Sequence, residues 1–158
     1  MKSRSGFTLV EILIVVVILG ILAAIVIPQF TEASTEAKTS SLVTDLQSVR
    51  SQIQLYKIQH LDQIPGTQAG NDFVTAMTTY TLQDGSSAAV QEPADGVYGP
   101  YLNQIPSNQF IATAALQDDV TEAAVTPAAA DNTTGWFFNT VTGEFKANDT
   151  YDASHWDL

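Results

Sequence analysis

The chain has 158 residues, of which 45% are hydrophobic and 15% are charged, and its formal net charge at pH 7 is −11. Such an acidic surface repels the phosphate backbone, which excludes bulk nucleic-acid binding and leaves only a local patch at one tip to consider. The chain has no cysteine, so it has no thiolate for a disulfide or for a usual zinc site.

A membrane-length apolar segment follows a short basic leader. The leader, residues 1–6, contains Lys2 and Arg4, and residues 7–27 are interrupted by a single acid, Glu11. As a helix rising about 1.5 Å per residue, this segment is about 31 Å long and matches a hydrocarbon core of about 30 Å. The next basic residue lies beyond the apolar segment, so the positive-inside rule predicts a cytoplasmic leader and an extracytoplasmic C-terminal part.

Two plainer interpretations compete for this segment. A removable secretory signal has a shorter apolar region and a small-residue cleavage site directly behind it, which this chain lacks. A simple uncleaved anchor explains neither the acid at Glu11 nor the pair Gly6-Phe7 at the start of the apolar run. Both interpretations therefore leave specific residues unexplained.

The run Gly6-Phe7-Thr8-Leu9-Val10-Glu11, followed by the apolar segment, resembles the type III signal of type IV prepilins and type II secretion pseudopilins. The resemblance is specific over residues 1–30 and weak beyond residue 65. It implies that prepilin peptidase, an intramembrane aspartyl protease, cleaves between Gly6 and Phe7 and N-methylates Phe7. It also implies that Glu11 meets the new amine of Phe7 between neighbouring subunits. An acid in an apolar setting is costly unless it is paired, and the alternative is an unpaired glutamate at the membrane interface.

Gly20 and Pro28 predict a weak stretch in the membrane and assembly helix, residues 7–28. Glycine is a poor helix former, and proline removes a backbone donor and clashes with the preceding turn. In filaments of the family that the chain resembles, the corresponding segment is often extended. We therefore expect the helix to be weakest between these two residues.

Residues 29–61 predict an amphipathic continuation of the same helix. Apolar residues recur there at spacings of four, three, four and three, which places them on one helix face. The stripe consists of Leu42, Leu46, Val49, Ile53 and Tyr56. The helix should end near His60 because Pro65-Gly66 cannot continue it. The striped face needs a partner, and we expect it to complete the core of the domain that follows.

Residues 62–158 predict a small extracytoplasmic globular domain. Asn71-Asp72 can cap a short helix that begins near Phe73. The segments 135–139 and 144–147 predict an antiparallel hairpin with aromatic core residues, and residues 111–134 predict a variable surface loop. With the resemblance, this predicts an α+β, pilin-like fold in which one long N-terminal helix packs on a small C-terminal antiparallel β-sheet.

No residue is assigned to catalysis or to a metal, and the chain is interpreted as a structural protein and not an enzyme. His60 and His155 lie in no nucleophile or metalloprotease motif. A bound calcium often fixes the C-terminal loop of pseudopilins, but the spacing of Asp149, Asp152 and Asp157 is not that of a calcium loop. We interpret these acids as a solvated tail, and calcium is not assigned.

The sequence and the resemblance together predict a structural subunit of a helical filament, most similar to a major pseudopilin of type II protein secretion. Many type IVa major pilins close a C-terminal loop with a disulfide, so the absence of cysteine favours the pseudopilin over the close alternative, a type IV pilus subunit for adhesion, twitching motility or DNA uptake. A monomeric membrane-anchored binding protein is the alternative from another class. The expected partners are further copies of the chain, prepilin peptidase and an inner-membrane assembly platform. The expected location is the inner membrane, followed by a periplasmic or surface filament.

Overall fold

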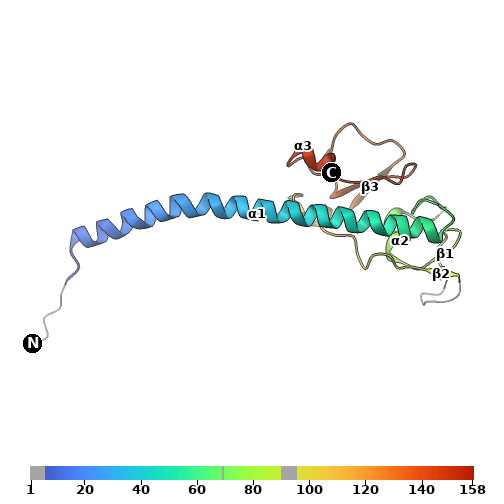
Figure 1. The fold of residues 1–158 in the computed structure, drawn as a ribbon, viewed down its shortest axis with the longest axis horizontal. Coiled ribbons are helices and arrows are strands. Elements are labelled where there is room, and N and C mark those ends of the chain that lie inside the picture. The colour runs from blue at the N-terminus through green and yellow to red at the C-terminus, as the bar shows by residue number, and fades with distance from the viewer. Residues whose placement is uncertain (1–5, 69, 90–95) are drawn as a thin grey trace, which may run out of the picture. The chain divides into compact units, whose positions relative to one another are not determined.

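The computed structural model describes residues 6–68, 70–89 and 96–158, and the chain divides into two compact units, residues 1–39 and 40–158. One helix, α1 (Leu9–Gln59), contributes to both units and is a continuous ribbon in Figure 1. The other elements belong to the second unit. In chain order they are α2 (Phe73–Thr78), β1 (Thr81–Leu82), β2 (Val97–Tyr98), η1 (Ala114–Leu116), β3 (Val120–Ala123), β4 (Trp136–Asn139), β5 (Phe145–Ala147) and α3 (Ala153–Trp156).

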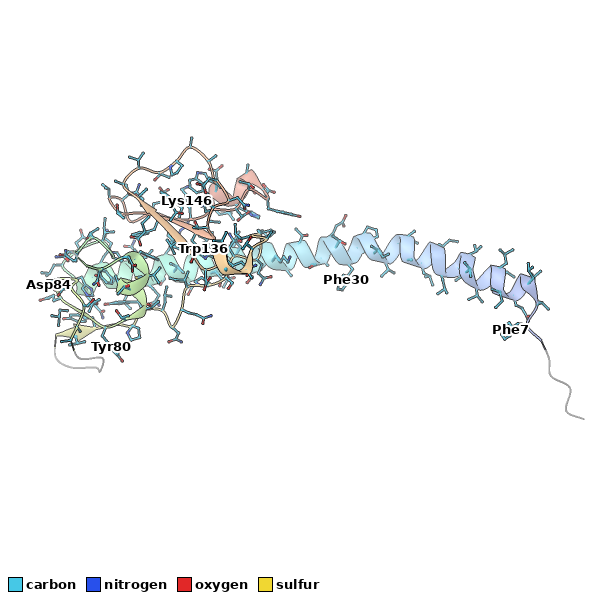
Figure 2. The ribbon with its side chains drawn as sticks, turned by 180° about the vertical axis from the view of Figure 1, so that it is seen from behind. Phe7, Phe30, Tyr80, Asp84, Trp136 and Lys146 are labelled. Carbon is cyan, nitrogen blue, oxygen red and sulfur yellow. The ribbon has the colours of Figure 1, made fainter. Side chains whose placement is uncertain are left out.

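In the first unit, α1 is long and apolar enough, by length and composition, to cross a membrane. Every large apolar side chain from Leu9 to Ile27 is at least half exposed. The side chains of Phe7 and Phe30 likewise project from the chain in Figure 2. A helix that is apolar around its whole circumference is typical of a segment surrounded by lipid or by other helices. The membrane-length segment predicted from the sequence is thus helical from Leu9 onward.

In the second unit, α1 buries the predicted stripe. Its buried residues are Leu42, Leu46, Val49, Ile53 and Tyr56. They belong to the same core cluster as Phe73, Trp136 and Phe145, and Trp136 lies beside α1 in Figure 2. The amphipathic interpretation is therefore confirmed, because the striped face completes the domain core.

The end of α1 follows from backbone geometry. The helix ends at Gln59, and Leu61 and Asp62 then adopt positive φ angles of 55° and 64°. The Asp62 N–H donates to the Lys57 carbonyl at 2.8 Å, which satisfies one of the carbonyls left free at a helix end. The helix thus ends close to the predicted position.

Two predicted elements of the globular domain are confirmed. Asp72 caps α2, accepting a hydrogen bond from the Thr75 N–H at 2.6 Å through its side chain. The strands β4 and β5 form the predicted antiparallel hairpin, with Trp136 opposite Ala147. The aromatic residues of this hairpin are core residues, since Trp136 is fully buried.

The sheet differs from the prediction in one respect. The α+β pilin-like fold is confirmed, but the larger sheet has the order β3-β4-β5, and β3 pairs parallel with β4. The predicted surface loop 111–134 was therefore wrong where it contains η1 and β3. A parallel pair needs a connection of about a dozen residues, and residues 124–135 supply it. The short segment Val120–Ala123 becomes a strand because its backbone pairs with that of the buried strand β4.

The second sheet is small and separate. The strands β1 and β2 pair antiparallel, with Thr81 opposite Tyr98. Thr81 is fully buried and contacts His60 at the end of α1. This sheet therefore anchors the segment that follows α2 to the C-terminal end of the long helix.

Candidate functional site

The predicted cleavage position lies just outside the helix. Gly6 and Phe7 precede the first helical residue, Leu9, and Phe7 is 81% exposed. A Cβ at Gly6 would meet no atom within 4 Å. A protease binds the bond that it cuts in an extended backbone conformation, which a helix does not offer. Gly6 and Phe7 are not helical and are accessible, so their position suits cleavage.

Thr8 and Glu11 form a reciprocal cap at the start of α1. The Glu11 carboxylate accepts hydrogen bonds through Oε2 from the Thr8 N–H at 2.7 Å and from the Thr8 hydroxyl at 2.8 Å. The Glu11 N–H in turn donates to Thr8 Oγ1 at 3.3 Å. This is a capping box, which satisfies two backbone donors that a helix start leaves free. Thr8 was not among the residues predicted from the sequence, although the spacing Thr-x-x-Glu is the signal for this cap.

The cap leaves part of the Glu11 carboxylate available. Both hydrogen bonds from Thr8 go to Oε2, and within the described part of the chain Oε1 accepts none. A carboxylate can accept through both oxygens. Glu11 can thus hold its own helix start with one oxygen and present the other to a cation from outside the subunit.

Gly20 and Pro28 both lie inside continuous α1. A Cβ at Gly20 would meet open space, so no close packing within this chain requires a glycine there. Pro28 lacks an N–H and leaves the Ala24 carbonyl without its helical donor. One turn further on, the Thr31 hydroxyl donates to the Ile27 carbonyl at 3.1 Å. The expected weakness between Gly20 and Pro28 concerns the assembled filament and stays a prediction.

The C-terminal acids are not a uniformly solvated tail. Asp149 is only 1% exposed and accepts hydrogen bonds from His155 Nδ1 at 2.8 Å and from Asn108 Nδ2 at 3.0 Å. Asp152 caps α3 by accepting from the Ser154 N–H at 2.9 Å. Asp157 is exposed. The solvated-tail interpretation was therefore wrong for Asp149, because its carboxylate is buried and is satisfied by hydrogen bonds from Asn108 and His155.

These acids do not form a calcium cage. Calcium needs six to eight oxygen ligands, whereas both oxygens of Asp149 already accept hydrogen bonds within the fold. Over residues 6–68, 70–89 and 96–158, no group of three or more His, Asp or Glu side chains could hold a metal ion. The described residues thus do not fit the calcium site that is often found in the pseudopilins that the chain resembles.

His60 occupies a closed aromatic environment at the end of α1. It is fully buried and stacks on Tyr56 with ring centroids 3.8 Å apart. Its Nδ1 lies 2.9 Å from the Tyr56 carbonyl, which can only accept, so Nδ1 carries the proton. Nε2 then accepts from the Thr81 hydroxyl at 2.9 Å. His60 is therefore a neutral structural residue with both ring nitrogens satisfied.

This environment makes the stability of the domain depend on pH. Burial lowers the pKa of His60 below its ordinary value of 6.5, against the smaller opposing effects of the Tyr56 and Leu82 backbone and the Asp84 charge. The unfolded chain thus binds the proton more tightly, and stability is lost as the pH falls through and below 6.5. We expect thermal unfolding to occur at a lower temperature at about pH 5 than at about pH 7.5.

The variant His60→Asn isolates this contribution. Its amide N–H₂ can still donate to the Tyr56 carbonyl, but it does not titrate. We expect the variant to be less stable than the wild type at neutral pH and to lose less stability on acidification. Thermal unfolding followed by near-UV circular dichroism measures the stability of both proteins. If both lost the same stability on acidification, the pH dependence would belong to other groups.

Comparison with known proteins places these features in context. Residues 1–27 match the family described as prokaryotic N-terminal methylation motif. The chain is 42% identical over 69 residues to the type II secretion system core protein G of Pseudomonas aeruginosa, a match that covers 44% of this chain and 48% of that protein. It is 32% identical over 112 residues to the protein of the same name from Klebsiella pneumoniae, covering 70% of this chain and 71% of that protein.

A pilus protein is also similar to the chain. A fimbrial protein of Pseudomonas aeruginosa is 30% identical over 100 residues, which cover 63% of this chain and 65% of that protein. No solved structure matches the chain at a significant level. The similarities thus extend beyond the methylation motif into the globular domain.

Proposed function

We propose that this chain, which belongs to the family of the type II secretion system core protein G, is a membrane-anchored structural subunit of a helical filament. The observation that carries the proposal is the N-terminal methylation motif over residues 1–27 joined to one long apolar helix. The filament that we propose is the pseudopilus, the short filament of type II secretion, because the relatives with this match are type II secretion system core proteins G. Its role is structural and not catalytic.

Processing is the first step of the proposed function. Prepilin peptidase cleaves between Gly6 and Phe7 and methylates the new N-terminus at Phe7. The open, non-helical position of both residues supports this step. Removal of Lys2 and Arg4 changes the formal net charge from −11 to −13 before the new amine is counted. The mature subunit is then more acidic than its precursor.

The membrane arrangement follows from charge and hydropathy. The basic leader stays in the cytoplasm, residues 7–28 span the inner membrane, and the amphipathic residues 29–61 and the domain 62–158 lie outside the cytoplasm. The support is the charge of the leader and the apolar circumference of α1 in the first unit. The chain is thus a single-pass protein before assembly.

Assembly requires the apolar helix to exchange lipid for protein. Leaving the bilayer would expose the side chains between Leu9 and Ile27 to water, unless other copies cover them. We propose that these helices form the filament core with the help of an inner-membrane assembly platform. Within the core, the free Oε1 of Glu11 receives the amine of Phe7 from a neighbouring subunit. The pairing cancels two charges that would be costly alone.

Two other functions remain to be distinguished. The similarity to a fimbrial protein favours, as the second candidate, a type IV pilus subunit for adhesion, twitching motility or DNA uptake. A monomeric membrane-anchored binding protein would keep its leader and would not depend on Glu11. Deletion of the gene separates the first two, because a pseudopilus subunit is needed for exoprotein secretion and a pilus subunit for surface motility or adhesion.

The decisive experiment is intact mass and N-terminal sequencing of the protein from membranes and from sheared surface fractions of its host. A chain that begins at N-methylated Phe7 supports the filament subunit, and abundance in the sheared fraction favours a surface pilus over a periplasmic pseudopilus. Protein that still begins at Met1, in cells with active prepilin peptidase, would rule out the filament function and leave a plain anchor.

A further inference from the structure

Residues 149–158 are held in place by tertiary contacts more than by regular secondary structure. We call them the C-terminal segment, which contains the short helix α3 (Ala153–Trp156). A helix of about one turn gains little stability of its own, because nucleation is costly. The segment nevertheless buries His155 and Trp156. Its position therefore depends on the side chains that tie it to the rest of the domain.

Asp149 is the centre of these contacts, and it is only 1% exposed. Its Oδ1 accepts hydrogen bonds from His155 Nδ1 at 2.8 Å and from the Tyr151 N–H at 3.3 Å. Its Oδ2 accepts from Asn108 Nδ2 at 3.0 Å. A buried carboxylate is costly unless such donors satisfy it. Groups of the protein thus satisfy both oxygens of Asp149.

Asn108 joins the C-terminal segment to two other parts of the domain. It is fully buried, and its Nδ2 also donates to the Gly135 carbonyl at 2.9 Å. Its Oδ1 accepts from the Phe110 N–H at 3.0 Å, and the Phe110 ring packs against His155 with ring centroids 4.5 Å apart. We call Asp149, Asn108 and His155 the clasp, because together they close the C-terminal segment onto the loop that precedes η1 and onto the start of β4.

Two cationic side chains hold the main chain of the same segment. Lys146 Nζ donates to the Trp156 carbonyl at 2.8 Å, and Arg50 Nη1 donates to the Leu158 main-chain oxygen at 2.7 Å. A calcium ion that fixes a loop is bound by carboxylate and main-chain oxygens of this kind. In this chain, N–H groups of side chains reach both kinds of oxygen. The protein itself thus supplies the contacts that a metal ion would otherwise make.

We propose that the clasp fixes the C-terminal segment in place of a metal ion, and that the domain therefore reaches its folded state independently of calcium. This departs from the pseudopilins that the chain resembles, in which a bound calcium often fixes the corresponding loop. The proposal concerns the fold of the single subunit. Its consequence for assembly, that the subunit enters a filament without loading calcium, rests on the proposed filament function.

The calcium dependence of unfolding tests the proposal without any variant. The full-length wild type in detergent is unfolded thermally at neutral pH, with excess EGTA and again with millimolar calcium, and tryptophan fluorescence follows the transition. Calcium at about 100 times its Kd, bound only to the folded domain, would raise the unfolding temperature by about 10 °C or more. We expect the two unfolding temperatures to agree within about 1 °C.

Matched changes of aspartate to asparagine test the clasp itself. Asp149→Asn keeps the shape of the buried side chain but turns one acceptor into an N–H₂ group that faces donors. Asp157→Asn makes the same change at an exposed position of the C-terminal segment. We expect Asp149→Asn to lower the unfolding temperature by about 5 °C or more, equally in EGTA and in calcium. Hydrogen exchange of residues 149–158, measured by mass spectrometry, should become faster by about tenfold. We expect Asp157→Asn to change neither.

The outcomes separate the clasp from the filament function. Stabilisation of the wild type by calcium of about 5 °C or more, or a loss with Asp149→Asn that occurs only in calcium, would overturn the proposal and leave the filament function untouched. Unchanged hydrogen exchange of residues 149–158 in folded Asp149→Asn would also overturn it. Failure of the processed wild type to form any filament in its host would overturn the filament function, whereas calcium-independent unfolding of the subunit would still support the clasp.

Discussion

The variant Glu11→Gln is expected to be processed normally and to fail in filament assembly. Glutamine keeps the shape of the side chain and can still accept the hydrogen bonds from the Thr8 N–H and hydroxyl, so the start of α1 is preserved. It carries no charge, and the amine of Phe7 is then buried without a partner. An unpaired buried charge costs about 3–5 kcal/mol, so we expect incorporation to fall by about 100-fold or more.

The comparison variant is Thr8→Ala. It removes the Thr8 hydroxyl from the capping box but leaves the Glu11 carboxylate in place. The loss of such a cap costs about 1 kcal/mol at a helix start. The amount of each variant recovered in filaments, from the periplasm as well as from sheared surface fractions, is measured together with the N-terminal sequence of the membrane pool. We expect a modest reduction for Thr8→Ala and a severe one for Glu11→Gln. Equal losses would mean that Glu11 acts through the helix start and not through its charge.

The variant Leu46→Ala is expected to destabilise the globular domain strongly. Leu46 is 1% exposed and belongs to the core cluster that α1 shares with α2, β4 and β5. Truncation of a buried leucine to alanine costs about 2–5 kcal/mol, because the surrounding structure fills the cavity only in part. For a domain of this size, we expect the unfolding temperature to fall by about 10 °C or more.

Leu55→Ala is the matched control on the same helix. Leu55 is 41% exposed, and alanine favours the helix, so we expect a change within about 0.5 kcal/mol. Thermal unfolding of both full-length variants in detergent, followed by tryptophan fluorescence, measures the difference. Similar effects at the two positions would show that the domain folds without the helix and would contradict the shared core.

The two variants also separate stability from assembly. Leu46 lies on the buried stripe, whereas Leu55 lies on the exposed side of the same helix. A loss of filaments with Leu46→Ala is therefore expected to accompany a loss of folded subunit. A loss with Leu55→Ala is expected to occur with a fully folded subunit.

Local patterns predicted several parts of the fold correctly. The stripe from Leu42 to Tyr56, the cap at Asp72 and the β4–β5 hairpin each depend on residues within a few positions of one another. Helical spacing, capping chemistry and a run of consecutive aromatic residues are short-range signals, and they lie entirely within the segments concerned. The capping box of Thr8 and Glu11 has the same kind of signal, the spacing Thr-x-x-Glu, but it was not among the predicted features.

Long-range pairing explains the errors. The strand β3 is short and polar, and it becomes a strand only because β4, after a connection of residues 124–135, pairs with it in parallel. Asp149 looked like a surface acid, but Asn108 and His155 surround it in the fold. No local pattern indicates which distant donor will reach a carboxylate.

The sequence by itself determined the membrane-length helix, the processing motif and the acidic character of the chain, since each of these depends on composition and on the order of neighbouring residues. Only the tertiary structure decided which side of α1 is covered by the domain and which side stays exposed and uncharged. It also decided that Asp149 is buried and accepts a hydrogen bond from Asn108, and that His60 is enclosed by the rings of Tyr98 and Tyr101. These features arise from contacts between residues far apart in the chain, and their free energy depends on the burial that the whole fold creates.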